Sequence, residues 1–144
     1  MKNQRIINIF KTYLAHTGKK ITWEREEILT LLLEKQGHFK VEDIVKITES
    51  SKNRISRATV YRTFNMLESA GIISHFYDHN HEKSYEINHE HHDHLICAKC
   101  GKIIDFTNED QEKIQKQICS QYHFFPIFHS LHIYGICQNC LTKD

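Results

Sequence analysis

The sequence predicts an α+β protein, with an N-terminal winged helix-turn-helix followed by a smaller α/β half that binds metal. Helical periodicity runs through residues 1–70 and gives way to short strand patterns after Gly71. Charge is uneven, with 13 basic and 8 acidic residues in 1–70 against 6 and 10 in 71–144. Seven of the twelve histidines crowd into residues 75–94, and all five cysteines follow from Cys97 onward. The first half is therefore expected to bind a polyanion, and the second half is expected to bind metal.

Four helices are predicted in the first half. The first covers residues 5–16, where apolar side chains recur every four positions. The second begins at Thr22, a good N-cap residue that precedes several glutamates, and a short third helix covers residues 41–48. The fourth begins after Ser56 as N-cap and ends at Gly71, where a glycine suits the position after a helix. A helical set of this kind followed by a hairpin is the plan of a winged helix.

Strand patterns follow Gly71. Residues 72–77 and 83–87 predict a hairpin around a turn rich in Asp, Asn and His. The later elements are expected as two strands, a helix and a last strand, over residues 94–97, 102–106, 108–121 and 126–136. We place the domain boundary at the end of the hairpin, which gives a DNA-binding domain over 1–87 and a metal-binding domain over 88–144.

Membrane insertion and secretion are not expected from the sequence. The longest apolar stretch, residues 28–33, is interrupted by Thr30 and is far shorter than the ~20 residues needed to span a bilayer. The first ten residues lack the apolar core and the cleavage site of a signal peptide. We therefore expect a soluble, cytoplasmic protein.

The strongest motif is a pair of C-x-x-C sequences. Cys97 and Cys100 form one, and Cys137 and Cys140 the other. Two such turns can supply four thiolates to one tetrahedral structural zinc. The alternatives are reduced buried cysteines or one redox-active pair. Cys119, alone in a predicted helix, is interpreted as a core residue.

A second motif is the run of residues 89–94, His-Glu-His-His-Asp-His. In a strand, His92 and His94 share one side, and His91 and Asp93 share the other. The segment can therefore give two ligands to each of two metals, unless it is only a solvated polar loop. Further ligands of the right type are Glu86, Asp105, Glu112 and His129. Such mixed sets suit Fe(II), Mn(II) or Zn(II).

A third motif is the helix that follows Ser56. With its apolar stripe turned inward, Arg57, Tyr61, Arg62 and Asn65 share the other side. Arginine and asparagine can read guanine and adenine edges in a DNA major groove. The alternative is an ordinary solvated face, but the charge asymmetry and the hairpin favour DNA binding.

Three segments together closely resemble the ferric uptake regulator family. They are residues 55–64 (ISRATVYRTF), 92–106 (HDHLICAKCGKIIDF) and 134–140 (YGICQNC). The resemblance implies a metal-dependent repressor that binds palindromic, AT-rich DNA as a homodimer, with a tetramer as a larger assembly. It implies an α/β dimerisation domain at the C-terminus. It also implies structural Zn(II) with Fe(II) or Mn(II) as corepressor, replaceable by Zn(II) in vitro.

The resemblance assigns residues to sites. Structural zinc would be held by Cys97, Cys100, Cys137 and Cys140. The regulatory site would comprise His38, Glu86, His92, His94 and Asp105, and an additional site would use His91, Asp93, Glu112 and His129. Lys20 resembles a minor-groove lysine, and the predicted DNA-binding set is Lys20, Ser56, Arg57, Thr59, Tyr61, Arg62 and Asn65. Because the regulatory ligands come from both halves, we expect metal to favour one orientation of the two.

The sequence also departs from the family pattern. Glu24 stands where members usually carry Gln or Pro, and Asp105 resembles the peroxide-sensing branch, whereas Glu86 resembles the iron-sensing branch. The alternatives are therefore a repressor of oxidative-stress genes that senses peroxide through Fe(II)-catalysed histidine oxidation, or a zinc-uptake regulator. More distant alternatives are a small metalloenzyme and a zinc-ribbon interaction module. We expect a regulator of metal-uptake or oxidative-stress genes and no enzyme.

Overall fold

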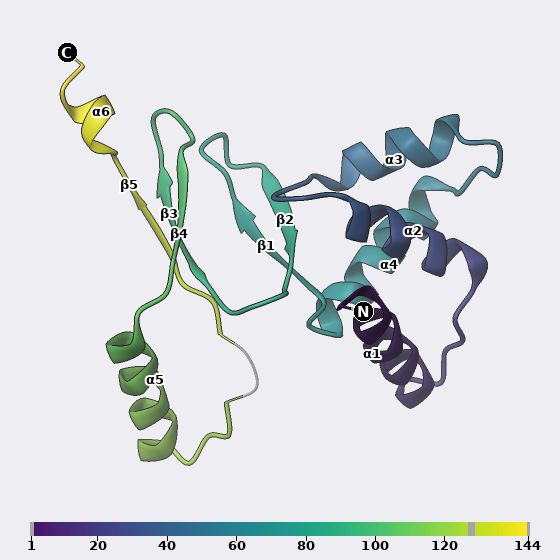
Figure 1. Cartoon of the computed structure of the whole chain (residues 1–144), viewed down its shortest axis with the longest axis horizontal. Coiled ribbons are helices and arrows are strands. Elements are labelled where there is room, and N and C mark those ends of the chain that lie inside the picture. Colours follow the sequence, from purple (N-terminus) through teal and green to yellow (C-terminus); the bar gives the residue numbers. More distant parts are fainter. Residues whose placement is uncertain (1, 127–128, 144) are drawn as a thin grey trace. The chain divides into compact units, whose positions relative to one another are not determined.

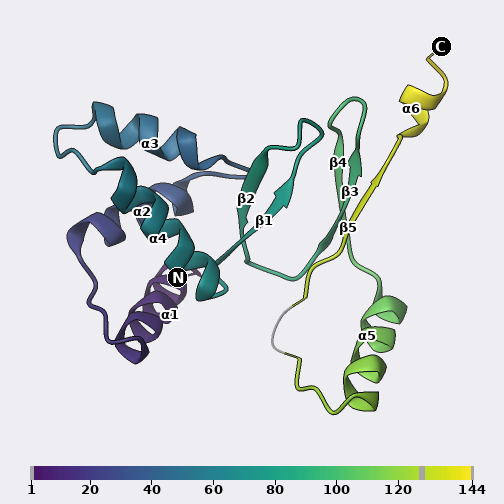
Figure 2. The same ribbon diagram turned by 180° about the vertical axis from the view of Figure 1, so that it is seen from behind.

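The protein folds as two compact units. A computed structural model describes residues 2–126 and 129–143 (Figure 1; Figure 2 gives the view from behind). The first unit comprises residues 2–76 together with 83–89, and the second comprises 77–82 together with the described residues from 90 onward. The sequence predicts a division after residue 87. The structure differs in that it groups the hairpin tip, residues 77–82, with the second unit.

The first unit contains four helices and a hairpin in the order that the sequence predicts. Thr22 caps α2 (Trp23–Glu34) by accepting a hydrogen bond from the Arg25 amide, and Ser56 caps α4 (Arg57–Ser69) by accepting one from the Thr59 amide. Both predicted N-caps are therefore confirmed. Gly71 follows α4 with a φ of +72°, a conformation that suits glycine. The elements are α1 (Lys2–His16), α2 (Trp23–Glu34), α3 (Val41–Ser50), α4 (Arg57–Ser69), β1 (Ile73–Tyr77) and β2 (Lys83–Ile87).

The core of this unit lies between the helices and the hairpin. Helix α1 buries Ile6, Phe10 and Leu14, one residue per turn, as the periodicity predicts. Phe64 of α4 meets the ring of Tyr85 edge to face at 5.0 Å. Each large side chain of this kind contributes about 1.5–3 kcal/mol when it is fully buried. The unit therefore has an apolar core of its own.

A third segment joins the hairpin. Phe39, in the loop between α2 and α3, pairs with Tyr85 of β2 through two backbone hydrogen bonds of 2.9 and 2.7 Å. The sequence did not predict this bridge. It fixes the loop that carries His38 next to the strand that carries Glu86.

The elements of the second unit are β3 (Asp93–Cys97), β4 (Ile103–Phe106), α5 (Glu109–Gln121), β5 (His132–Gly135) and α6 (Gln138–Leu141). The unit is built around β3. Its sheet has the order β4-β3-β5 among the described residues, with β4 antiparallel and β5 parallel to β3. The prediction of one strand over 126–136 was too long, since only 132–135 pair with β3 and residues 127 and 128 lie outside the described ones.

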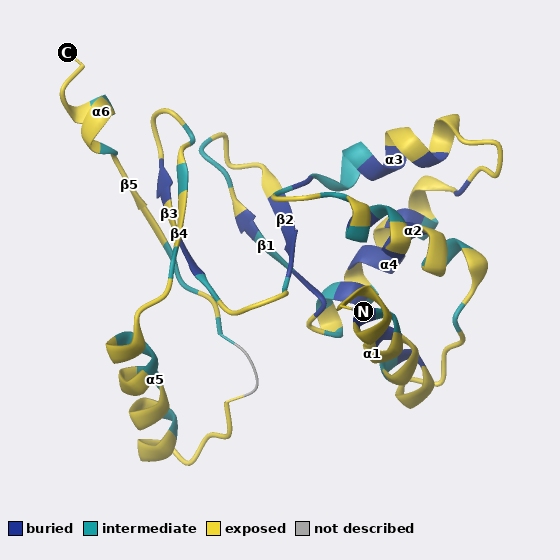
Figure 3. Ribbon diagram, viewed as in Figure 1, coloured by how far each residue is buried: buried dark blue, intermediate teal, exposed yellow. Residues whose placement is uncertain are grey.

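Burial differs between the units. In Figure 3 the hairpin strands and β3 carry buried residues, whereas α5 and α6 carry only intermediate and exposed ones in the described chain. Helix α5 exposes Ile114 and Ile118, and its C-cap residue Tyr122 is exposed four residues further on. The second unit therefore has little apolar core of its own.

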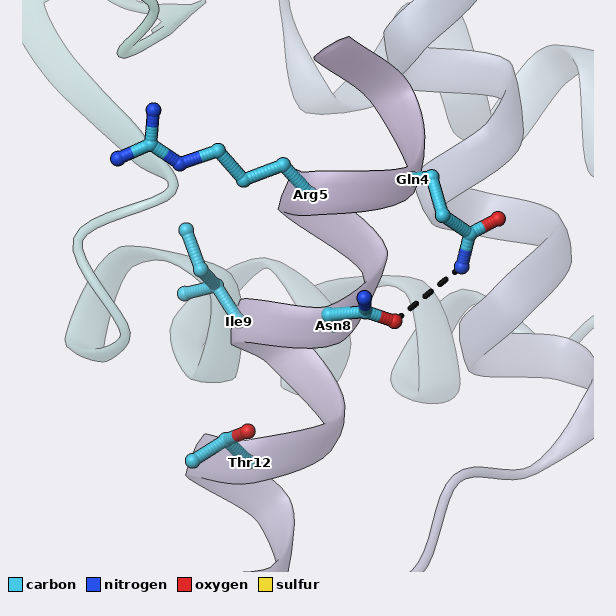
Figure 4. Close-up of a pocket in the computed structure, with 5 residues that line it drawn as sticks. All are labelled: Gln4, Arg5, Asn8, Ile9 and Thr12. Atoms are coloured by element: carbon cyan, nitrogen blue, oxygen red, sulfur yellow. Dashed lines mark hydrogen bonds between the residues drawn. The ribbon is translucent and has the colours of Figure 1, made fainter. Parts of the chain in front are cut away.

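The outer face of α1 is polar. Figure 4 shows Gln4, Arg5, Asn8, Ile9 and Thr12 along this face, with a hydrogen bond of 3.2 Å from Gln4 Nε2 to Asn8 Oδ1.

None of the helices in the described residues is both long enough and apolar enough to cross a lipid bilayer.

Candidate metal centres and DNA-binding surface

The four predicted zinc ligands lie together at one end of the second unit. Cys97 ends β3, Cys100 lies in the following turn, Cys137 precedes α6 and Cys140 lies within it. Their four sulfur atoms lie within 4.8 Å of one another. All five cysteines are free thiols, and Cys119 is half-buried on α5, outside this group. The spacing of the two C-x-x-C motifs therefore predicted the grouping correctly.

The cysteine cluster favours a thiolate. The backbone amides of Cys137 and Cys100 donate to Cys97 Sγ at 3.3 and 3.5 Å. These two hydrogen bonds, that of Cys137 foremost, lower the pKa of Cys97 to about 5. Hydrogen bonding to the Cys137 thiol raises the pKa of Cys140 to about 12. One thiolate is thus stabilised by fixed amides, and four sulfurs at this separation fit a tetrahedral zinc ion.

A second cluster joins β3, α5 and the segment before β5. Glu112 Oε1 lies 2.9 Å from His91 Nε2 and 3.2 Å from His129 Nε2. His91 Nε2 also lies 3.4 Å from Asp93 Oδ1. These are the four residues predicted for the additional site, and the structure brings them together.

Asp93 indicates that a cation fits this second cluster. The residue is 1% exposed, and its Oδ1 accepts a hydrogen bond from the Leu131 amide at 3.2 Å. Its Oδ2 is buried and has no hydrogen-bond partner among the described residues. Such an orphaned carboxylate oxygen is costly unless a cation balances it.

The third cluster lies on the sheet of the second unit. His94 is 1% exposed, and its Nδ1 lies 2.7 Å from Asp105 Oδ1 on the neighbouring strand. His92 Nε2 lies 4.0 Å from Asp105 Oδ2, and the rings of His92 and His94 meet at 4.8 Å. The predicted alternation is thus confirmed, since His92 and His94 share one side and His91 and Asp93 the other. The carboxylate fixes the orientation of the His94 ring.

A fourth group lies in the first unit. His38 Nε2 and Glu86 Oε2 are 3.3 Å apart. The bridge from Phe39 to Tyr85 explains the approach, because each partner adjoins one of the paired residues. The His38 ring also packs edge-on against Phe76 at 4.9 Å. A histidine and a carboxylate are two ligands, fewer than Zn(II), Fe(II) or Mn(II) requires.

The predicted DNA-binding face lies at the surface of α4 and its N-cap. Thr59 is half-buried, and the other members on this face, Ser56, Arg57, Tyr61, Arg62 and Asn65, are exposed. Lys20, also exposed, precedes α2, where its backbone carbonyl accepts a hydrogen bond from the Arg25 guanidinium. The structure thus presents the predicted residues at the surface, as DNA binding would require.

Glu42 of α3 lies at the DNA-binding face and was not predicted from the sequence. Its Oε1 accepts hydrogen bonds from Arg57 Nη1 at 2.5 Å and from Tyr61 Oη at 2.7 Å. The bond from Tyr61, followed by that from Arg57, lowers the pKa of Glu42. The signal available in the sequence was the acidic first turn of α3, Glu42 and Asp43, in the helix directly before the arginine-containing helix α4.

An N-terminal winged helix joined to a unit with several ligand clusters defines a metal-responsive DNA-binding regulator. Residues 16–134 match the sequence model of the ferric uptake regulator family, and the chain belongs to this family.

Relatives align along nearly the whole chain. The ferric uptake regulation protein of Campylobacter upsaliensis is 38% identical over 142 residues, covering 96% of this chain and 90% of its own. That of Yersinia pestis is 38% identical over 135 residues, covering 91% of each chain.

Solved structures agree with this assignment. The Helicobacter pylori ferric uptake regulator, described as having three functional metal binding sites, superposes with a TM-score of 0.72 at 29% identity over 99% of this chain and 95% of its own. The Francisella tularensis regulator with iron gives 0.64 at 40% identity, over 86% and 96%. The Pseudomonas aeruginosa regulator with manganese gives 0.72 at 29%, over 88% and 96%.

Proposed function

We propose that this chain is a metal-dependent transcriptional repressor that binds operator DNA when divalent metal is available. The observation that carries the proposal is the division of the regulatory ligands. His38 and Glu86 form a pair in the first unit, and His92, His94 and Asp105 form a group in the second. Each set alone undersaturates a six-coordinate cation such as Fe(II) or Mn(II).

Binding across the two sets would control orientation. Ligands from both sets can coordinate the same bound cation. His38 and Glu86 gain that binding energy only when the first unit adopts one arrangement relative to His92, His94 and Asp105. Solved structures of relatives with iron and with manganese favour Fe(II) or Mn(II) in this role. Only residues 87–91 separate Glu86 of the first set from His92 of the second in the sequence, so the connection between the sets is short.

The DNA surface supports the proposal. Arg57, Tyr61, Arg62 and Asn65 lie on one exposed face of α4, which would enter the major groove. Residues 1–70 carry a net charge of +5, which favours the phosphate backbone. We infer that Lys20 contacts the minor groove beside the same site.

We infer a homodimer formed through the second unit. Leu95, Ile104 and Ile133 are register neighbours across the three strands, and each is more than a third exposed. Strand β5 lies at the edge of the sheet, where a second copy can pair with it. A two-fold dimer would present two copies of α4 to successive major grooves of palindromic, AT-rich DNA.

The dimer has its own test. Ile133→Glu places a charge on the exposed apolar row and should convert the dimer to a monomer in light scattering after size exclusion. An unchanged mass would contradict this assignment of the interface.

The known relatives are transcription regulators, and we infer that this chain likewise works in the cytoplasm and without enzymatic turnover.

The decisive experiment compares operator binding of His92→Ala with the wild type at limiting Fe(II) or Mn(II). Gel shifts on a palindromic AT-rich duplex should show at least ten-fold weaker binding of the variant, about 1.4 kcal/mol. The matched control is His89→Ala, an exposed histidine three residues away that lies outside the clusters found among the described residues. Unchanged binding by His92→Ala would defeat the proposal.

Asp105 favours peroxide sensing as a second candidate function. Its carboxylate is 55% exposed beside His92, so a small oxidant could reach a cation held there. Exposure to peroxide with Fe(II), compared with Mn(II), should add one oxygen to His38 or His92 and release DNA. Peptide mass analysis without such an addition would remove this alternative and leave metal-dependent repression standing.

A further inference from the structure

Two buried oxygen atoms have no hydrogen-bond donor within the described part of the chain. They are Asp93 Oδ2 and Gln115 Oε1. A buried acceptor without a partner loses its hydration and gains nothing in return. A cation at the additional site would account for Asp93, but Gln115 belongs to none of the ligand sets described above.

Gln115 lies on the stripe of α5 that faces this site. It follows Glu112 by three residues, and residues at this spacing in a helix have Cβ atoms about 5–6 Å apart. Both side chains are half-buried, whereas Lys113, Ile114 and Lys116 are exposed. Since the Glu112 carboxylate contacts two histidines of the site, a glutamine amide on the same stripe is within reach of an ion held there.

We propose that the Gln115 amide oxygen is a fifth protein ligand of the additional site and selects Mn(II) or Fe(II) over Zn(II). The proposal rests on the proposed function, because it takes the additional site as a metal site. With Gln115, the donor set becomes two imidazole nitrogens and three oxygens. Oxygen-rich sites of five or six ligands suit Mn(II) and Fe(II), whereas Zn(II) is satisfied by four.

A packing role does not explain this glutamine. A side chain that served only to fill space would be replaceable by an apolar one, and its amide oxygen would not be left buried without a donor. Gln117, two residues further along α5, is exposed and meets water instead. The two glutamines therefore provide a matched comparison on one helix.

The test uses the full chain with its zinc cluster intact and with the regulatory set disabled by His38→Ala and His92→Ala. In this background, Mn(II) binding is measured by electron paramagnetic resonance and Zn(II) binding by competition with a chromophoric chelator. Gln115→Leu should weaken Mn(II) binding at least ten-fold and Zn(II) binding less than three-fold. Gln115→Glu should restore Mn(II) binding, and Gln117→Leu should change neither.

Three outcomes would overturn the proposal: unchanged Mn(II) binding by Gln115→Leu, equal losses for both metals, or failure of Gln115→Glu to restore binding. The second outcome would indicate a packing role. Glu112→Ala distinguishes this failure from failure of the site itself. If Glu112→Ala leaves Mn(II) binding intact, no cation is held at the cluster, and the additional site falls together with its fifth ligand.

Discussion

The hydroxyl of Tyr134 forms hydrogen bonds with both backbone polar groups of Tyr77. Its hydroxyl donates to the Tyr77 carbonyl at 2.6 Å and accepts from the Tyr77 amide at 3.2 Å. Tyr134 lies on β5 beside Ile96 of β3, so the sheet of the second unit fixes the base of the hairpin tip. Two residues 57 positions apart thus make the tip part of the second unit, although its strands continue into the first.

Removing this hydroxyl should loosen the tip. Tyr134→Phe keeps the ring and deletes both hydrogen bonds, which at this partly exposed position should cost about 1 kcal/mol of unfolding free energy. Hydrogen exchange at the Tyr77 amide should accelerate, while exchange in α2 and α4 stays unchanged. Tyr122→Phe, at an exposed tyrosine of the same unit, is the control. Unaltered protection of the Tyr77 amide would contradict the prediction.

Gly101 should be hard to replace, for two separate reasons. Its φ is +79°, and a Cβ added there would lie 2.4 Å from Nδ1 of His79 in the hairpin tip. We expect Gly101→Ala to lose about 1–2 kcal/mol through backbone strain alone. The steric overlap should add to that loss, as measured by denaturant unfolding of the second unit.

A double mutant separates the two causes. His79→Ala removes the ring that the new Cβ would meet, so His79→Ala combined with Gly101→Ala should recover the steric part and retain the strain. If the losses of unfolding free energy in the two single mutants simply add in the double mutant, the close approach of His79 to Gly101 contributes nothing to the destabilisation.

Glu42 should restrain the DNA-binding face. It accepts hydrogen bonds from Arg57 and Tyr61, and its negative charge would lie near the phosphates of bound DNA. Glu42→Ala should therefore tighten binding to nonspecific duplex DNA. The slope of log K against log salt should steepen by roughly 0.9, as one further phosphate contact forms.

The control for Glu42 is Glu49→Ala, which also removes an acid of α3 but one lying 3.9 Å from Arg57. A Glu42→Ala protein with the wild-type salt slope would show that Arg57 and Tyr61 remain unavailable to DNA for another reason.

Local patterns in the sequence predicted most elements and two ligand groupings. The C-x-x-C spacing placed Cys97 with Cys100 and Cys137 with Cys140, and strand alternation placed His92 with His94, because both signals depend on near neighbours in the chain. The contact of Tyr77 with Tyr134 could not be predicted, since no local pattern encodes a pairing between distant segments. The last strand was predicted too long because apolar content favours extended structure, whereas pairing with β3 decides where β5 ends.

Zinc removal should unfold the second unit and spare the first. Helix α5 buries no described residue and α6 is a single turn, so the cysteine cluster replaces the missing core, whereas the first unit has its own. Structural zinc contributes about 10–16 kcal/mol in small peptides. Cys97→Ser, or a strong chelator, should therefore accelerate hydrogen exchange in β3 and β5 while α2 and α4 stay protected. Cys119→Ser, which leaves the cluster intact, should resemble the wild type. Equal loss of protection in both units would mean that the first unit depends on the metal-stabilised fold of the second.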